Sequence, residues 1–424
     1  MRNTPLLCAL LIIAINAGVG RAMAQDAQPP VESKGSPAYQ NEVLGVSLQA
    51  LPPETRVVED QYLSDAFGFT LVAPDGRMVL RVAWRHRDTP DQMEQRAQEL
   101  VRGFPGLNLR PQPVSVDSYR GVMVANAPGM DPSLYVYLTA YGRLYEIICP
   151  QRDGNRQGCE TLLSLISFGP ASRSLEELHL IRAENALYEK PPVLGFPRPK
   201  SPIGIEILKE KEKVLRSGGN GAFSVEPLAA PGCADWPTWK FLQTPWASTA
   251  NGPGTPWPQG WSQAGPSYYG EGLHQYCNRT NGLNDYHALD FPLKEWDIVY
   301  PPAPGRVLYA GWAGGGWATL GRVVIVDLGN GYWSMAAHLR SINVSAGQDV
   351  GISTVIGYAG RSGNYQDGYW PSNHLHQGLY LNAQLYQPYG GIYGGQSVEP
   401  HHVRYFGNGG GYYETIGRYQ WMSW

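Results

Sequence analysis

Several familiar signatures of enzymes and metal proteins are absent from this sequence of 424 residues. There is no H-E-x-x-H, so a helix-borne zinc site with a glutamate base is excluded. There is no G-x-S-x-G, which disfavours a serine hydrolase with a nucleophile elbow. The glycine run Gly314–Gly316 is not followed by G-K-[ST], so it is not a Walker phosphate loop. No C-x-x-C occurs either, which disfavours a structural zinc knuckle.

Charge is scarce as well, at 16% of residues, with a formal net charge of −3 and a pI near 6.3. Such a balance produces no basic field to attract nucleic acid or an anionic membrane surface, and we find no nucleic-acid module. The composition is globular, and its 51 glycines and 35 prolines favour turn-rich β structure over helical bundles.

No apolar run reaches about 20 residues, the length that a membrane-spanning helix needs. Residues 1–24 instead have the pattern of a signal peptide. Arg2 supplies a positive charge, Leu6–Ala14 is apolar, and Ala22-Met23-Ala24 is a cleavage motif. We therefore expect a secreted protein, periplasmic or extracellular, with no stable membrane insertion after cleavage. A retained anchor is one alternative. A lipoprotein modified at Cys8 is a weaker one, because Cys8 lies inside the apolar run.

The chain has five cysteines, and signal cleavage would leave Cys149, Cys159, Cys233 and Cys277. Four cysteines permit three pairings, among which a sequence alone does not choose. We favour Cys149–Cys159, which closes a short polar loop, and Cys233–Cys277, at the start of the C-terminal part. Disulfides agree with export to an oxidising compartment.

The first folded unit is expected over residues 39–170, after a polar leader over residues 25–38 that we expect to be disordered. Short apolar stretches divided by turn signals predict strands. Thr89 and Pro90 are suited to cap and open one helix, which reaches about Gly103. The pattern predicts a small α+β domain without a catalytic constellation. It could be a pro-segment, an inhibitor of a binding groove or a substrate-targeting module.

Residues 171–232 contain one predicted amphipathic helix, Ser172–Leu187, and then a Pro-rich and charged linker. From residue 233 to residue 424, Trp, Tyr and Gly become frequent and helical periodicity disappears. Strand–turn–strand patterns replace it, most clearly in a hairpin between Val323 and Leu339. We predict a mainly β C-terminal domain with an antiparallel sheet.

Histidines and one aspartate stand out in this C-terminal part. His374 and His376 are two residues apart, so on a strand both rings would point to one face. Asp290 lies in an otherwise apolar strand, where a carboxylate is costly unless it is paired or binds a metal. His338 ends the predicted hairpin. One carboxylate and several imidazoles suit zinc.

Each of these signals is weak when it is taken alone. A single histidine in a strand is usually a satisfied core or surface residue, H-x-H arises by chance, and an aspartate such as Asp290 can simply cap a turn. Aromatic residues in the surrounding loops, such as Trp317 and Trp370, could line a groove or could only pack the loops. The order in which the motifs occur along the chain is more informative than any one of them.

The segments around these residues resemble the lysostaphin/LytM-type zinc endopeptidases, and most closely their beta-lytic branch. The matching motifs are A-L-D-F at Asp290, the hairpin ending in A-H-L at His338, V-x-x-G-x-x-V, I-G-x-x-G, and H-L-H at His374 and His376. The resemblance covers about residues 233–390. It implies a LytM/lysostaphin-like fold, a Zn²⁺ cofactor and peptidoglycan peptides as substrate at the cell wall.

The resemblance also implies roles for single residues. Asp290 and His376 would be zinc ligands, and His338 and His374 would be the catalytic histidines. The first ligand is open between two residues. His287 stands three positions before Asp290, and on an extended strand these two side chains would point to opposite faces. His274, in Gly-x-His well upstream, matches the beta-lytic arrangement, so we favour His274.

Two histidines and one aspartate would leave the fourth position of a tetrahedral zinc for water. Because no glutamate base is present, His338 or His374 would take the proton and the other would help to stabilise the oxyanion. The alternative is a non-catalytic LytM-type scaffold that binds or activates another cell-wall hydrolase. Such a scaffold would not need every ligand position to be filled, as it is here.

Overall fold

The computed structural model describes residues 36–62, 65–151, 156–174, 274, 276–291 and 293–401, with further short strands at 238–240, 246–247, 403–407 and 410–414. Pro37–Trp424 form one compact unit. Within it we distinguish an N-terminal lobe, residues 37–174, and a C-terminal lobe, residues 274–398. Each lobe is built on a seven-stranded antiparallel sheet. No helix of the described part is long and apolar enough to cross a membrane.

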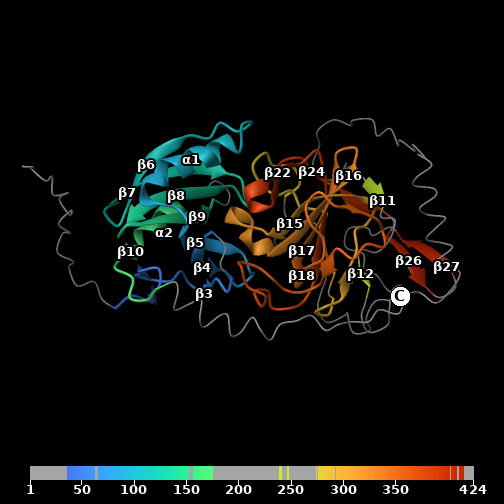
Figure 1. Ribbon diagram of the computed structural model, residues 1–424, viewed down its shortest axis with the longest axis horizontal. Helices are drawn as coiled ribbons and strands as arrows, with labels where there is room; N and C mark the ends of the chain where they lie inside the picture. The colour runs from blue at the N-terminus through green and yellow to red at the C-terminus, as the bar shows by residue number, and fades with distance from the viewer. Residues whose placement is uncertain are drawn as a thin grey trace, which may run out of the picture. The chain divides into compact units, whose positions relative to one another are not determined.

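The N-terminal lobe has the sheet order β3-β4-β5-β9-β8-β7-β6. Its strands are β3 (Arg56–Glu59), β4 (Phe67–Val72), β5 (Met78–Trp84), β6 (Pro111–Val116), β7 (Tyr119–Ala127), β8 (Ser133–Ala140) and β9 (Arg143–Pro150). A second sheet joins β1 (Tyr39–Asn41), β2 (Val46–Leu48) and β10 (Ile166–Phe168). The helices are η1 (Pro90–Gln92), α1 (Met93–Arg102) and α2 (Arg156–Ser164), and α1 packs against β7 and β8 (Figure 1).

Local sequence explains these elements. The apolar stretches predicted as strands form β4, β5, β8 and β9, and every residue of β4 is buried. The helix begins where the capping residues predict, because the Gln92 side chain accepts a hydrogen bond from the Thr89 backbone N–H at 2.7 Å. Gly103 follows the last residue of α1. The α+β prediction for this region is confirmed.

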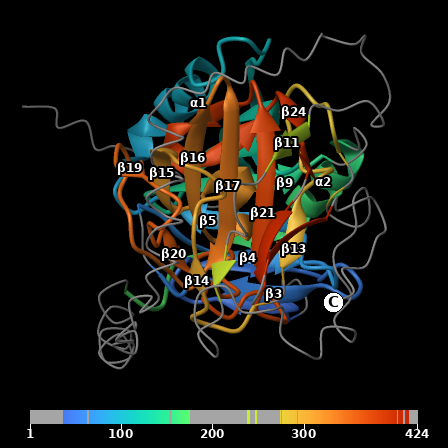
Figure 2. The same cartoon turned by 90° about the vertical axis from the view of Figure 1, so that its right-hand side faces the viewer.

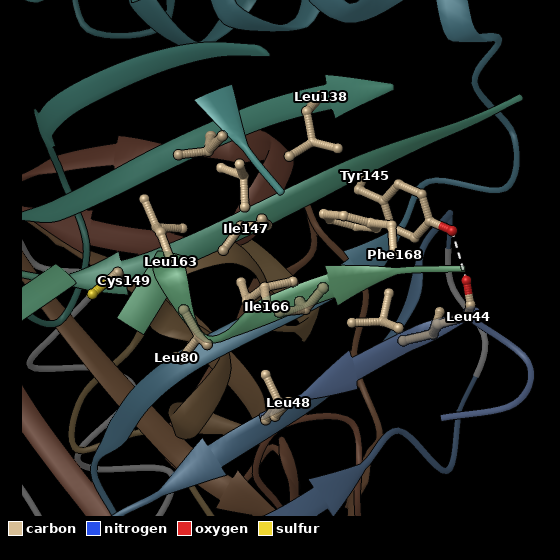
Figure 3. Packing of buried hydrophobic residues seen from close by; sticks show 14 of the residues in the cluster. Leu44, Leu48, Leu80, Leu138, Tyr145, Ile147, Cys149, Leu163, Ile166 and Phe168 are labelled. Atoms are coloured by element: carbon tan, nitrogen blue, oxygen red, sulfur yellow. Dashed lines mark hydrogen bonds between the residues drawn. The ribbon is translucent and has the colours of Figure 1, made fainter. Parts of the chain in front are cut away.

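The core of the N-terminal lobe lies between its two sheets (Figure 3). Leu48 and Ile166 from the small sheet pack with Leu138 and Ile147 from the large one. The Tyr145 hydroxyl donates a hydrogen bond to the Leu44 carbonyl at 2.6 Å, so this buried polar group is satisfied.

One disulfide joins β9 to α2 in the N-terminal lobe. Cys149 and Cys159 are bonded, as predicted from their spacing. Cys277 is also disulfide-bonded. Cys233, which we paired with it, lies outside the described residues, as does the predicted helix Ser172–Leu187 beyond Ser174.

The C-terminal lobe has the sheet order β13-β21-β17-β16-β15-β19, with β24 also paired to β21 (Figure 2). The strands are β13 (Leu289–Phe291), β15 (Gly305–Trp312), β16 (Arg322–Gly329), β17 (Tyr332–Leu339), β19 (Asp349–Val350), β21 (Leu375–Leu381) and β24 (Gln396–Ser397). The predicted hairpin is confirmed as β16 and β17.

Smaller sheets complete the C-terminal part. One has the order β12-β14-β20-β18, formed by β12 (Trp246–Ala247), β14 (Ile298–Val299), β20 (Gly357–Tyr358) and β18 (Ser341–Ile342). The paired strands are β11 (Thr238–Lys240) with β25 (Glu399–His401), β22 (Gln384–Tyr386) with β23 (Gly391–Tyr393), and β26 (Val403–Gly407) with β27 (Gly410–Glu414). Two 3₁₀ helices are η4 (Gly315–Leu320) and η5 (Gln387–Tyr389). The mainly antiparallel β prediction is confirmed.

The two faces of the C-terminal sheet pack differently. Side chains alternate between the faces of a strand. On one face, Val324, Ala336 and Leu379 belong to a core made of C-terminal residues alone. On the other face, Val323, Met335 and Tyr380 belong to a core that also contains residues of the N-terminal lobe.

Candidate metal centre

Three adjacent strands bring the candidate site together. In the antiparallel register, Asp290 of β13 lies opposite His376 of β21, and His376 lies opposite Ala337 of β17. Directly opposite residues of neighbouring strands point to the same face. Asp290 and His376 therefore share the face that carries Ala337.

His274, Asp290 and His376 form a group whose metal-binding atoms all lie within 4.8 Å of one another. The Asp290 carboxylate oxygen Oδ1 is 2.9 Å from His376 Nδ1 and 3.8 Å from His274 Nε2. It is the one group of three or more such side chains found in the described part of the chain. These are the three residues that the sequence predicts as ligands, with His274 favoured over His287.

Burial and charge in this group fit a cation. Burial lowers the pKa of His274, which keeps its ring neutral and able to offer a lone pair. Burial would raise the pKa of Asp290, but the neighbouring His274 and the hydrogen bond with His376 bring it well below its usual range. Within the described residues, His274 Nδ1 and His376 Nε2 are buried and have no hydrogen-bond partner. Two imidazoles and one carboxylate are a donor set that zinc accepts.

His338 and His374 stand beside this group. Their ring centres are 4.6 Å apart, and that of His338 is 5.7 Å from the ring of His376. His338 Nδ1 lies 3.1 Å from the carbonyl oxygen of Ser362, and His374 Nδ1 lies 3.0 Å from that of Ser372. A carbonyl oxygen only accepts, so Nδ1 carries the proton in both rings. In a ring that carries a single proton on Nδ1, Nε2 is an acceptor.

The backbone at His338 is unusual, because its φ of +61° lies in the left-handed region, which a non-glycine residue seldom adopts. Such strained residues cluster at functional sites. The His338 ring is buried, and burial lowers its pKa well below the usual value, so it is neutral at physiological pH.

Trp370 covers the two histidines that flank the metal-binding group. Its ring centre is 5.0 Å from that of His338 and 5.8 Å from that of His374. The indole nitrogen of Trp370 donates a hydrogen bond to the Thr319 carbonyl oxygen at 3.1 Å, which holds the ring in place. Trp317, in contrast, is fully buried and packs in the core. The loop-packing interpretation therefore holds for Trp317, whereas Trp370 lies at the site.

Two further titratable residues near the site have shifted pKa values. His287 is not part of the metal-binding group; its ring packs on that of Tyr286 at 4.9 Å, and burial lowers its pKa to about 4. Asp285 is buried, and burial raises its pKa to about 7. We did not single out Asp285 from the sequence, where it is one acidic residue in a polar loop.

Residues 285–388 match the model of Peptidase family M23. This part of the chain is an M23 domain. M23 is a family of zinc-dependent peptidases. The matched segment contains Asp290, His338, His374 and His376, whereas His274 lies eleven residues upstream of its start. No curated protein matches the sequence.

Solved M23 structures are similar to part of this chain. The catalytic domain of lysostaphin from Staphylococcus simulans is 21% identical over 30% of this chain and 87% of its own, with a TM-score of 0.23. The catalytic domain of EnpA from Enterococcus faecalis is 21% identical over 30% of this chain and 85% of its own, with a TM-score of 0.21.

Proposed function

We propose that this protein is an exported zinc metalloendopeptidase that hydrolyses peptide bonds in peptidoglycan stems or cross-bridges. The observation that carries the proposal is the convergence of two imidazoles and one carboxylate on one face of an M23 sheet, with two more imidazoles beside them. The signal-peptide pattern of residues 1–24 supports export to the wall.

In this proposal His274 Nε2, Asp290 Oδ1 and His376 Nδ1 hold the zinc, because these atoms face one another. Bound zinc would lower the pKa of water towards about 7 and polarise the scissile carbonyl group. The ionised Asp290 carboxylate offsets part of the metal charge, and burial of His274 keeps its lone pair available.

His338 and His374 would carry the proton transfers. Each has its Nδ1 proton directed to a backbone carbonyl, so each turns Nε2 away from that bond. One Nε2 would accept the proton of the attacking water and later pass it to the leaving amine. The other ring would help zinc to stabilise the oxyanion of the tetrahedral intermediate through an Nε2 proton that it takes from solvent before the reaction and keeps throughout. Trp370 packs on both rings and limits their rotation.

The proposal is tested by zinc content and wall lysis of the wild type, His274→Ala, His376→Ala and His287→Ala. His287→Ala is the matched control, because it also removes a buried histidine near Asp290. We expect His274→Ala and His376→Ala to lose bound zinc and at least about 10³-fold in lysis, since each leaves only two ligands. The control keeps its zinc.

Other outcomes would correct the proposal in defined ways. Loss of zinc in His287→Ala, with retention in His274→Ala, would exchange the first ligand and leave the enzyme class intact. A wild type that holds no zinc and cuts no wall peptide, even when its two lobes are separated, would instead favour a scaffold that acts through another hydrolase.

A further inference from the structure

The site face of the M23 sheet is covered by the N-terminal lobe. Asp290 and His376 share their face with Ala337, and along β17 and β16 the same face continues through Met335 and Ile325. The three apolar side chains are fully buried. They belong to one apolar cluster with Tyr135, Tyr137 and Ile148 of the N-terminal lobe. The opposite face has a core of its own, made of C-terminal residues.

Polar contacts fix the cover at one edge of this cluster. The Tyr135 hydroxyl accepts a hydrogen bond from the Gly316 N–H at 2.7 Å, and the Met130 N–H donates to the Gly316 carbonyl oxygen at 3.0 Å. Arg279 of the C-terminal lobe forms an ion pair with Asp131 at 2.9 Å. The N-terminal lobe thus bonds directly to the backbone of η4, beside the sheet.

A second set of contacts reaches the catalytic histidines. Val58 and Val72 of the N-terminal lobe form a small apolar cluster with Tyr369 and Trp370, and Trp370 is the residue that covers His338 and His374. The Trp370 ring lies so close to Gly76 that a Cβ there would come within 2.1 Å of it. The cover therefore reaches the side chain next to the candidate catalytic groups.

Hydrogen bonds hold this second region as well. The Arg56 guanidinium donates to the Tyr369 carbonyl oxygen at 2.9 Å and stacks over the Tyr369 ring. The N–H groups of Gln61 and Tyr62 both donate to the Tyr365 carbonyl oxygen, at 3.0 and 3.2 Å. The Tyr62 hydroxyl donates to Asp367. The loop 361–370, which leads into His374, is thus bound to the N-terminal lobe along its length.

This arrangement conflicts with the access that an endopeptidase needs. A peptide bond in the middle of a wall strand must reach the metal with chain extending on both sides. Yet His274, His338 and His376 are each no more than 4% exposed. The apolar floor beside them is already filled by another part of the same chain.

We propose that the N-terminal lobe is a built-in cover of the substrate face, which keeps the peptidase latent until the lobe separates from the M23 sheet. The inference rests on the proposed function for its consequence, the latency. The covered face itself stands on the shared core and on the hydrogen bonds between the lobes. The N-terminal lobe thus occupies this face first, and an extended peptide binds there after the lobe has separated.

The test uses the full chain with a recognition sequence for a specific protease inserted between Gly219 and Asn220, which lie between the lobes in the sequence. Cutting turns an intramolecular contact into a bimolecular one, so dilution releases the cover by mass action. We expect the uncut chain to be at least about tenfold less lytic per mole than the cut chain at nanomolar concentration. The specific activity of the cut chain should fall as its concentration rises.

A matched pair of variants ties this behaviour to the interface. Arg56→Ala removes an arginine that bonds to the loop 361–370. In the cut chain of this variant we expect the two lobes to separate at a protein concentration several-fold higher than in the wild type. Arg156→Ala removes an exposed arginine of α2 whose contacts, with Glu160 and with the Met123 sulfur, both lie within the N-terminal lobe, so it should leave the release concentration unchanged. Equal shifts in both variants would count against the interface.

The rate of methionine oxidation reports whether the N-terminal lobe still covers the sheet, and it requires neither catalysis nor a bound metal. Met78 and Met335 are buried in the core shared by the lobes, whereas Met123 is buried in the core of the N-terminal lobe. In the diluted cut chain, peroxide should oxidise Met78 and Met335 at least about tenfold faster than in the uncut chain, with Met123 still protected. Protection of Met335 in the diluted cut chain, or full lysis by the uncut chain, would overturn the proposal. Exposed Met335 and bound zinc without lysis would count against the peptidase function and leave the covered face standing.

Discussion

The two lobes have the same kind of framework, but they surround a carboxylate with different partners. Each is built on a seven-stranded antiparallel sheet. In the N-terminal lobe, Asp60 is fully buried and receives two hydrogen bonds from the Arg81 guanidinium, at 2.8 and 2.6 Å. In the C-terminal lobe, the buried histidines His274 and His376 stand next to Asp290.

The difference separates a charge that is paired within the chain from one that we propose binds a metal. Arg81 is always protonated, so Asp60 has its counter-charge within the chain. Burial lowers the pKa of His274, so at neutral pH that ring is a poor cation and a good ligand. A carboxylate held beside such rings is suited to a cation from outside the chain. The fold is shared, and the site depends on the side chains that interrupt its apolar pattern.

The largest expected effects come from replacing each of the two aspartates, Asp290 and Asp60, by asparagine. Asp290→Asn should lose zinc and at least about 10³-fold in lysis, because a neutral amide is a far weaker zinc ligand. Asp60→Asn should keep zinc but lower the free energy of unfolding by about 3–5 kcal/mol, because it leaves Arg81 buried without its counter-charge. Zinc content and urea unfolding of both variants measure this. Similar stability losses with zinc retained in both would remove the distinction.

The next effect separates ligands from acid and base groups within the C-terminal lobe. His374→Ala and His338→Asn should each retain zinc and lose about 10²–10⁴-fold in the rate of peptide hydrolysis. Asn is chosen at position 338 because it tolerates the positive φ better than Ala. Metal analysis and kinetics are done on chains cut between the lobes. Loss of zinc from either variant would reassign that residue as a ligand.

The pH dependence of stability provides a third test. Burial raises the folded-state pKa of Asp285 to about 7, above its unfolded value. Its contribution to stability is therefore full below the unfolded pKa and is lost as pH rises towards 7. Relative to Asp285→Asn, the metal-free wild type should lose up to about 4 kcal/mol between pH 4 and pH 7.

Urea unfolding of both chains at several pH values, with a chelator present, measures the difference. His287 has the opposite sign, because burial lowers its pKa to about 4 and its contribution is lost as pH falls from about 6.5. It is present in both chains, so its effect cancels in the comparison. A difference between the chains that does not change with pH would show that Asp285 stays ionised in the folded protein.

The smallest effect concerns the disulfide of the N-terminal lobe. Cys149 and Cys159 are separated by 10 residues, so removing the bond should lower the free energy of unfolding by roughly 2–3 kcal/mol. The double variant Cys149→Ser, Cys159→Ser should keep its zinc, because both cysteines lie in the core of the N-terminal lobe, which contains none of the proposed ligands. Urea unfolding measures the loss, and reduced zinc binding would link the two lobes more closely than we infer.

Much of the fold could be predicted from local sequence. The alternating and continuous apolar stretches that form β4, β5, β8 and β9 were recognisable, and so was the hairpin of β16 and β17. The start of α1 follows from Thr89 and Gln92, whose groups bond within one turn. These features depend on contacts between residues close in sequence, which is why the sequence reveals them.

The candidate site could be predicted only in part. Asp290, His338, His374 and His376 were singled out from their motifs, and the structure brings them together with His274, although their roles remain predictions. The choice between His274 and His287 could not be made by counting residues, because a loop of free length precedes Asp290. The contacts of Trp370 and the burial of Asp285 had no signal in the sequence.

By itself, the sequence determined which side chains are available: residues suited to bind zinc, a strand pattern that gives Asp290 and His376 one face, and caps and turns that set the element boundaries. Only the tertiary structure decided what lies on that face. An apolar strand residue such as Met335 must be buried, but any complementary surface can bury it. That the surface is the N-terminal lobe, with Tyr135 bonded to Gly316, follows from packing between residues 181 positions apart, and local propensity does not encode contacts at that range.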